Sequence, residues 1–474
     1  MLIATNPRCD ARRHSTRTPV KTAKTEPDDQ IAVTRLLAEW SSDTRDGAVS
    51  ATAFEWARHV MLDWLAVTIA AANEPLVRML VQTYGGSSDL SCTLLAHGAR
   101  ARPHDAALIN GAAGHALDFD DVASRMFGHP SVPVVPAALA LAQSEGASGR
   151  DLLRALVVGH EIESRLGEMV GPSHYLHGFH ATGTVGTFGA AAACANLLRL
   201  NAGQTAHALG LAATQAAGLK SMFGTMAKPL HAGKAAMNGL MAAQLAARGF
   251  TANDSAIECL QGFAQTMAPE RAPFPKRIDT GGGFAIESTL FKYHASCYLT
   301  HSAIEAIRQA RQRHGIDLDA MASMTINVSG NHRGVCDIEV PQTGLSVKFS
   351  IQHLAALALD GANTAALDLY IDETARDARY VAARDRIALV MNESAEDRNF
   401  ASVTLRTRSG QTFTEEANVA VPATDLPAQW QRLQVKARAI AEPVIGAARF
   451  ERLVDAVGAL DRSPSLNPLL EAIQ

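Results

Sequence analysis

The amino-acid sequence predicts a mainly α protein, with a large all-helical domain followed by a smaller α+β domain, called here the lid domain. Up to about residue 270, apolar and alanine-rich segments recur at helical spacing, and little of the sequence alternates as a strand would. The Pro- and Gly-rich stretch APERAPFPKRIDTGGG then interrupts this pattern, and alternating segments follow it. A chain of 474 residues is also too long for a single core, which favours two domains.

Four parts are expected in chain order. Residues 1–30 are predicted to be a disordered tail, since they lack a continuous apolar segment and show only a weak similarity to an organellar transit peptide. Residues 31–270 form the helical domain and residues 271–420 the lid domain. Residues 421–474 are predicted to be helices that return to the helical domain.

The helical domain is predicted from segments with one apolar face or with alanine-rich, wholly apolar character. Prolines open one of these segments, and the polar turn Asn201–Gly203 separates two others. The predicted helices are Thr52–Ala72, Ala106–Asp118, Val132–Glu145, Gly149–Leu166, Thr184–Leu198, Gln204–Gly218 and Lys234–Arg248.

The lid domain is predicted from short alternating strands with helices between them. Met324–Val328 alternates, and the Ser409–Gly410 turn joins Ala401–Leu405 to Thr412–Thr414 as a hairpin. The helices predicted in this half of the chain are Thr300–His314, Phe349–Asp360 and those within Ala428–Ile473.

Composition excludes several classes of function. A formal charge of -4 gives no footprint for nucleic acid. The longest apolar run, Val60–Ala72, is interrupted by Asp63 and is shorter than the roughly 20 residues that span a membrane. The six cysteines form no CxxC pair, which argues against structural zinc or an iron–sulfur cluster. These observations predict a cytoplasmic protein with reduced thiols and no metal.

The stretch from Gly178 to Ala236 is the strongest candidate for chemistry. It contains no carboxylate and is rich in Gly, Ala and Thr, yet it carries His180, Lys228, His231 and Lys234. Small neighbours leave such cations partly desolvated, and desolvation favours the neutral, basic form. Lys228 precedes Pro229, so we expect it outside the helix. Acid–base chemistry on an anionic substrate is the function that this pattern favours.

Two further motifs admit structural alternatives. In HALDFDDVASRMFGH, Asp118, Asp120, Asp121 and His129 can form a polar site at a helix end or bind a divalent cation. The alternative is that Asp120 and Asp121 end a helix and are solvated. The glycines of GTVGTFG are predicted to serve close helix packing and not phosphate binding, since no strand precedes them.

Cations and aromatic residues also cluster in FKYHASCYLTH (291–301) and KFSIQH (348–353). These segments can face a cleft between the domains, or they can be ordinary core aromatics beside solvated cations. Cys297 is a conceivable nucleophile, but no neighbouring residue resembles a preset triad. In HYLHGFH, we expect at least two of the three histidines to be surface residues and retain only His180.

Taken together in this order and spacing, these motifs and the GHEIESRLG helix resemble the MmgE/PrpD family over about residues 31–470. The resemblance implies a helical domain, a lid domain and a homodimer. It also implies an active site between the domains that needs no metal or organic cofactor. Family members include 2-methylcitrate dehydratase, cis-aconitate decarboxylase and iminodisuccinate epimerase.

The resemblance also implies pocket residues. The positions that match are Asp118, His129, His180, Lys228, Lys292 and His301. Decarboxylase-type members have a histidine where Cys297 stands, a tyrosine where His353 stands and a threonine where Val122 stands, which counts against that reaction. Tyr175, before His180, is closer to the epimerase-like branch.

From these residues we expect a hydro-lyase of the 2-methylcitrate type acting on a small di- or tricarboxylate. Lys228, Lys292 and His301 would hold substrate carboxylates, with His353 also facing the substrate, because the reaction builds negative charge beside a carboxylate. His180 or Asp118 would remove a proton, and His129 would protonate the departing hydroxyl. The alternatives are an epimerase that uses Tyr175 and Lys228, a cis-aconitate-type decarboxylase and a catalytically silent scaffold.

Overall fold

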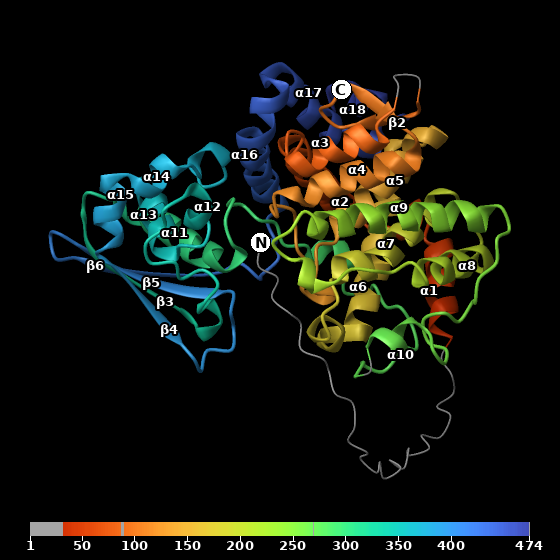
Figure 1. The fold of residues 1–474 in the computed structure, drawn as a ribbon, viewed down its shortest axis with the longest axis horizontal. Coiled ribbons are helices and arrows are strands. Elements are labelled where there is room, and N and C mark those ends of the chain that lie inside the picture. Colours follow the sequence, from red (N-terminus) through yellow and green to blue (C-terminus); the bar gives the residue numbers. More distant parts are fainter. Residues whose placement is uncertain (1–31, 87–89, 269, 474) are drawn as a thin grey trace, which may run out of the picture. The chain divides into compact units, whose positions relative to one another are not determined.

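The computed structural model describes residues 32–86, 90–268 and 270–473 (Figure 1). The predicted tail, residues 1–30, lies outside the described residues. The described chain is mainly α-helical, with two small β-sheets, and the predicted fold class is therefore confirmed.

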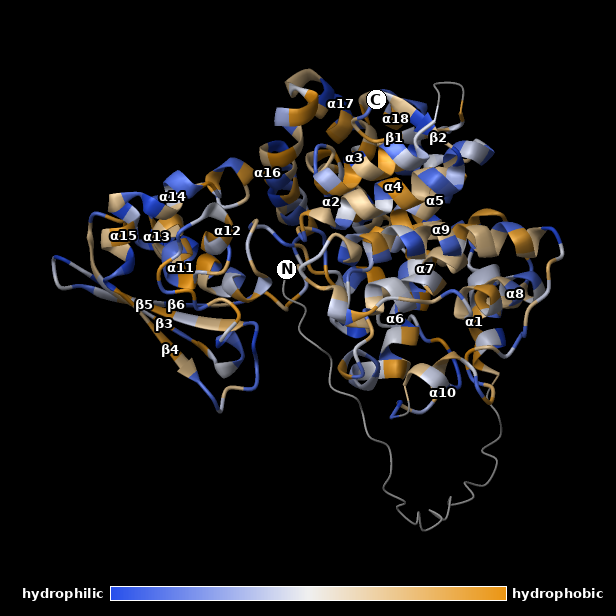
Figure 2. Ribbon diagram, in the orientation of Figure 1, coloured by the Kyte–Doolittle hydropathy of each residue, from blue (hydrophilic) through white to orange (hydrophobic). Residues whose placement is uncertain are grey.

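The first half of the described chain is a helical bundle with one short hairpin. Hydrophobic residues are abundant along its inner helices, among them α2 and α4 (Figure 2). The helices are α1 (Val33–Asp43), α2 (Ala51–Ala70), α3 (Pro75–Tyr84), α4 (Pro103–Ala116), α5 (Ser131–Glu145), α6 (Gly149–Leu176), α7 (Ala181–Leu197), α8 (Ala202–Ala213), α9 (Ala227–Ala247) and α10 (Phe263–Met267). The hairpin pairs β1 (Cys92–Leu94) with β2 (Ala99–Ala101).

Helix α7 lies at the centre of this bundle, and all of its residues are buried. The glycines of GTVGTFG make that possible. A methyl group on Gly186 would lie 2.5 Å from Pro133 of α5, and one on Gly189 would lie 2.6 Å from Glu163 of α6. Side chains larger than hydrogen would push these helices apart. The predicted packing role of these glycines is confirmed.

The second part of the chain builds a four-stranded sheet in the order β4-β3-β5-β6. In Figure 1 its helices lie over one face of the sheet, and β5 alternates buried and partly exposed residues as a one-sided strand does. The elements are α11 (His301–His314), β3 (Met321–Ser329), α12 (Gly344–Val347), α13 (Ile351–Asp360), α14 (Asp372–Arg376), α15 (Ala378–Arg384), β4 (Ile387–Asn392), β5 (Phe400–Thr407) and β6 (Thr412–Asn418). Strand β4, which pairs parallel with β3, was not predicted.

Three helices end the chain: α16 (Leu426–Ile445), α17 (Ala447–Gly458) and α18 (Asn467–Ile473). Helix α16 packs on α2, and Lys436 of α16 forms a 2.6 Å ion pair with Asp63 of α2. Among the described helices, none is long and apolar enough to cross a membrane by itself, although α2 and α3 together, bent by 90°, reach the required length and composition.

Three predicted boundaries in the helical bundle differ from the structure by about five residues or more. Helix α9 begins at Ala227, so Lys228 is a helical residue, because a proline is tolerated in the first turn. Helix α8 ends at Ala213 and not at Gly218. Helix α6 extends to Leu176 and not only to Leu166. It is interrupted at Gly171, where φ is 53° and ψ is -158°.

Candidate active site

The loop between α4 and α5 carries the acidic motif. Its first turn places Asp118 in the left-handed region, with φ of 51°, a conformation that aspartate adopts more readily than most residues. The Asp118 side chain remains 57% exposed, whereas Asp120 and Asp121 are each 1% exposed. The alternative in which Asp120 and Asp121 are solvated is therefore wrong.

Two lysines from distant parts of the chain contact Asp118. Lys228, in the first turn of α9, places its Nζ 2.9 Å from Asp118 Oδ1. Lys292 Nζ lies 3.2 Å from the same oxygen and 2.6 Å from the Asp118 carbonyl oxygen. Reciprocal backbone hydrogen bonds between Val122 and Leu290, 2.8 and 2.9 Å long, hold the Lys292 segment beside the loop.

The charges around Asp118 favour an anionic ligand. Burial alone would raise the pKa of Asp118, but the ammonium groups of Lys292 and Lys228 hold it well below its ordinary value. Asp118 is therefore ionised at neutral pH. The two ammonium groups can accept a carboxylate of a ligand in place of Asp118.

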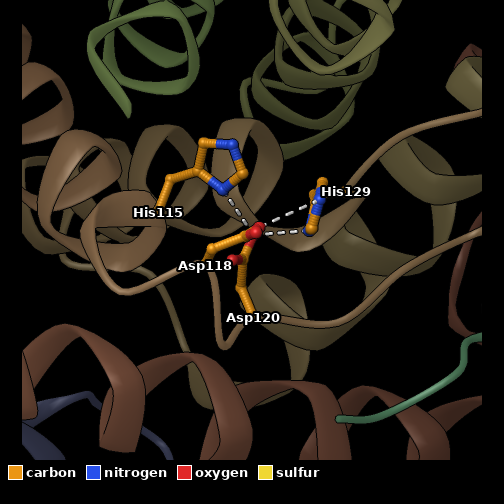
Figure 3. A group of neighbouring side chains, drawn as sticks. All are labelled: His115, Asp118, Asp120 and His129. Carbon is orange, nitrogen blue, oxygen red and sulfur yellow. Dashed lines mark hydrogen bonds and ion pairs between the residues drawn. The ribbon is translucent and has the colours of Figure 1, made fainter. Parts of the chain in front are cut away.

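His115 and His129 both face Asp120. His115 Nδ1 lies 2.9 Å and His129 Nδ1 lies 3.0 Å from Asp120 Oδ2 (Figure 3). His129 Nε2 is also 3.6 Å from Asp118 Oδ1, so its ring lies between the two carboxylates. Burial lowers the pKa of His115 to about 4, although Asp120 opposes the shift. Asp120 thus orients His115, which is neutral at pH 7, and lies beside the ring of His129.

His180 joins this group from the N-terminus of α7. Its N–H donates to the Gly218 carbonyl oxygen at 3.0 Å, which fixes the residue before the helix begins. Its ring stacks on His115, with centroids 5.6 Å apart, and its Nδ1 is 3.1 Å from His231 Nδ1. Burial lowers the pKa of His180, and the nearby ammonium group of Lys228 lowers it further. The ring is therefore neutral, with one nitrogen that can donate a proton and one that can accept a proton.

The contacts of Tyr175 and His353 lie elsewhere. The Tyr175 ring has Lys220 Nζ 3.7 Å from its centroid, in the part of α6 that follows the break at Gly171. His353 is buried in α13, and its Nε2 is 3.1 Å from the Thr374 carbonyl oxygen. Among the described residues, no hydrogen bond or ion pair joins either residue to Asp118, and their site roles stay predictions.

His301 and Cys297 lie near Lys292 in sequence but have their own partners. His301 is buried, with Nε2 3.3 Å from the Ser296 carbonyl oxygen, and lines a cavity of about 590 Å³ that does not include Asp118, His180 or Lys228. The neighbouring Cys336 thiol lowers the pKa of Cys297 below its ordinary value.

A second set of contacts, on the buried side, supports the loop between α4 and α5. Lys436 Nζ donates to the Phe119 carbonyl oxygen at 2.8 Å while it pairs with Asp63. Asp121 accepts a hydrogen bond from the Ser131 backbone N–H at 3.3 Å, and its other oxygen contacts the Ser131 hydroxyl. These contacts fix the backbone on both sides of Asp120.

The donor atoms of His115, Asp118, Asp120 and His129 lie within 4.8 Å of one another, a spacing that a metal ion could use. The arrangement does not fit a cation. Asp118 Oδ1 already bonds two ammonium groups, and both histidines direct Nδ1 at a single oxygen of Asp120 and not at a common centre. We derive no step through a metal at this site.

Contacts in the structure therefore connect five predicted site residues in one cluster: Asp118, His129, His180, Lys228 and Lys292. His115 was not predicted to be a site residue. It is the first residue of HALDFDD and lies in the last turn of a buried helix, a position that could have indicated its role. No local pattern marked Lys436, which lies 373 residues from Asp63 in sequence.

Comparison with known proteins gives two matches to protein families. The MmgE/PrpD N-terminal domain matches residues 35–274, and the MmgE/PrpD C-terminal domain matches residues 294–462. A cis-aconitate decarboxylase from Aspergillus terreus is 28% identical over 469 residues, covering 93% of this chain and 96% of the relative. A cis-aconitate decarboxylase from Mus musculus is 27% identical over 380 residues, 76% of each chain.

Proposed function

The chain belongs to the MmgE/PrpD family, and from this premise we propose that it is a lyase for a small tricarboxylate, with its active site at Asp118, Lys228 and Lys292. One observation carries the proposal. Two ammonium groups converge on one oxygen of Asp118 beside the neutral ring of His180. A substrate carboxylate that enters here replaces Asp118 as the partner of at least one lysine.

Decarboxylation of an unsaturated tricarboxylate of the cis-aconitate type is the first candidate reaction, because the curated relatives bear that name. The bond between carbon and one carboxylate breaks, carbon dioxide leaves, and the electron pair spreads toward a neighbouring carboxylate. Lys228 and Lys292 stabilise that charge where it develops. His180 delivers the proton that the carbon then takes up.

Dehydration of a hydroxy-tricarboxylate of the 2-methylcitrate type is the second candidate. His129 favours it, because its ring lies between Asp118 and Asp120 and can pass a proton to a departing hydroxyl. The differences from the decarboxylase-type pattern at Val122 and Cys297 support it as well. The epimerase hypothesis gains no such support, since Tyr175 packs with Lys220.

An NMR assay in D₂O tests the proposal. The purified chain is mixed separately with cis-aconitate, 2-methylcitrate, citrate and iminodisuccinate. Decarboxylation predicts loss of carbon dioxide from cis-aconitate and one solvent deuteron on carbon in the product. Dehydration predicts a new alkene from a hydroxy acid. Lys292→Met is expected to abolish turnover, whereas Lys276→Met, at an exposed position, leaves it unchanged. If none of the compounds reacts or exchanges, the lyase proposal is wrong.

A further inference from the structure

His231, one turn after Lys228 on α9, contacts the ring of His180. We propose that His231 is a proton-relay residue that connects His180 with solvent, an inference that rests on the function proposed above. It acts through His180 and is not itself expected to touch the substrate.

The contact between the two rings is the first observation. The two Nδ1 atoms lie 3.1 Å apart, with ring centroids separated by 5.3 Å and planes inclined at 54°. A hydrogen bond between two ring nitrogens requires a proton on one of them and a lone pair on the other. The two neutral rings therefore hold opposite tautomers, one protonated at Nδ1 and the other at Nε2. This leaves Nε2 of His180 available for the substrate.

The fold makes room for this contact with two glycines. A methyl group on Gly183 would lie 3.0 Å from the His231 Cβ, and one on Gly218 would lie 3.4 Å from the His231 ring. Gly218 also adopts φ of 159°, and its carbonyl oxygen accepts the His180 N–H. The same backbone that fixes His180 thus holds His231 against it.

His231 also lines a cavity of about 290 Å³. His180 is 2% exposed, whereas His231 is half-buried, so His231 is the more accessible of the two rings. Its titratable wall residues, among those described, are His231 and Lys234, and Gln215 and Asn238 add neutral polar groups. Water in this cavity can exchange protons with His231 without passing the substrate.

Burial, and not a neighbouring charge, weakens His231 as a base. His180 faces it from α7, and Lys228 and Lys234 lie one turn away on either side along α9. Burial lowers the pKa of His231, so its protonated form is short-lived and passes the proton on. This suits a carrier, which must both gain and lose a proton in each turnover.

The relay balances for decarboxylation. Water in the cavity protonates His231 at Nε2, and His231 gives its Nδ1 proton to Nδ1 of His180. His180 gives its Nε2 proton to the carbon that lost the carboxylate, or to the carbon that is conjugated with it. One proton leaves solvent, one reaches carbon, and both rings end neutral. After product leaves, water gives a proton to Nε2 of His180, the Nδ1 proton passes back to His231, and His231 releases its Nε2 proton to water in the cavity, which restores the starting tautomers.

His231→Ala with added imidazole tests the relay. We expect kcat to fall about 10²-fold, at the lower end of the range for proton transfer by a side chain. KM is expected to stay unchanged, because His231 does not bind substrate. The substitution enlarges a cavity that already borders His231, so imidazole should restore kcat in proportion to its concentration. The restored reaction should again place a solvent deuteron on the product.

His231→Gln separates a relay from a structural role, because glutamine keeps a hydrogen bond to His180 but cannot carry a proton. The relay predicts that kcat is as low as in His231→Ala. His207→Ala is the matched control, since His207 is also half-buried and bonds the Ala252 carbonyl oxygen at 2.9 Å, away from His180. It should keep wild-type kcat and show no imidazole effect.

Two results would overturn the relay while leaving the proposed function intact. One is wild-type kcat in His231→Ala. The other is wild-type kcat in His231→Gln together with a loss in His231→Ala that imidazole does not restore. Absence of turnover in the wild-type chain with every carboxylate is a different outcome, because it removes the proposed function and the relay with it.

Discussion

Two groups of lysine and aspartate residues lie next to Phe119, and they differ in solvent exposure. Asp118, with Lys228 and Lys292, has a side chain that is 57% exposed. Asp63 and Lys436 are 2% and 1% exposed, and Lys436 also holds the Phe119 carbonyl oxygen. The carboxylate of the first group is accessible to solvent, whereas that of the second is not. Burial therefore separates the group proposed to bind substrate from the pair that supports the loop.

The pKa shifts show the same difference. At Asp118 the two ammonium groups outweigh burial, and the pKa falls. At Asp63 burial outweighs the single ammonium group, and the pKa rises, while burial lowers that of Lys436. An exposed carboxylate with two cations is ready to be replaced by another anion. A buried pair with one cation is costly to assemble and costlier to break.

The largest effect is expected from Lys228→Met. Loss of one of the two charges that stabilise the transition state should lower kcat/KM by about 10³-fold, or about 4 kcal/mol. Stability should change by less than about 1 kcal/mol, because the partner carboxylate is exposed. Steady-state kinetics and thermal melts measure both. Lys220→Met is the control, since its Nζ bonds the Tyr175 carbonyl oxygen at 3.1 Å. Equal kinetics in the two variants would contradict the assignment of Lys228.

The opposite pattern is expected from Lys436→Met. Asp63 would remain buried without a partner, which should destabilise the fold by about 3 kcal/mol. Replacing both residues, as Asp63→Leu with Lys436→Met, should recover most of that loss. Denaturant midpoints of the three variants measure it. A double variant no more stable than Lys436→Met would show that the Phe119 contact, and not the ion pair, carries the stability.

The sequence predicted the members of the exposed group better than those of the buried one. Asp118, Lys228 and Lys292 stand in motifs whose neighbours are small or aromatic, and a charged residue in such surroundings is conspicuous. Lys436 lies in WQRLQVKARAI, where basic residues recur as on any solvated helix. Its burial depends on where α16 packs, and a contact across 373 residues leaves no local pattern.

Backbone geometry explains the other differences. Local periodicity predicted the long helices of the bundle, but it could not locate the break in α6 at Gly171 that precedes Tyr175. It also did not predict the parallel strand β4, because that strand is defined by its pairing with β3, which is distant in sequence. The sequence left open whether Asp120 is solvated or part of a polar site, and only the fold brings His115 and His129 to it.

Asp121→Asn is expected to have the smallest effect on stability. Among the described residues Asp121 forms no ion pair, so it extends the comparison to a buried aspartate without a cation partner. Burial raises the pKa of Asp121 to about 8, with Asp63 adding to the shift. Between the unfolded pKa near 4 and this value, the folded chain keeps a proton that the unfolded chain releases. This group therefore makes stability fall by about 1.4 kcal/mol for each pH unit of rise in that window. Asp121→Asn has no proton to lose, so its stability relative to wild type should increase by about that amount from pH 5 to pH 6. Denaturant midpoints at the two pH values measure the change. Asp319→Asn, at a side chain that is 82% exposed, should show no such increase. A difference that shrinks as pH rises would mean that Asp121 is ionised in the folded chain and that a cation outside the described contacts compensates it.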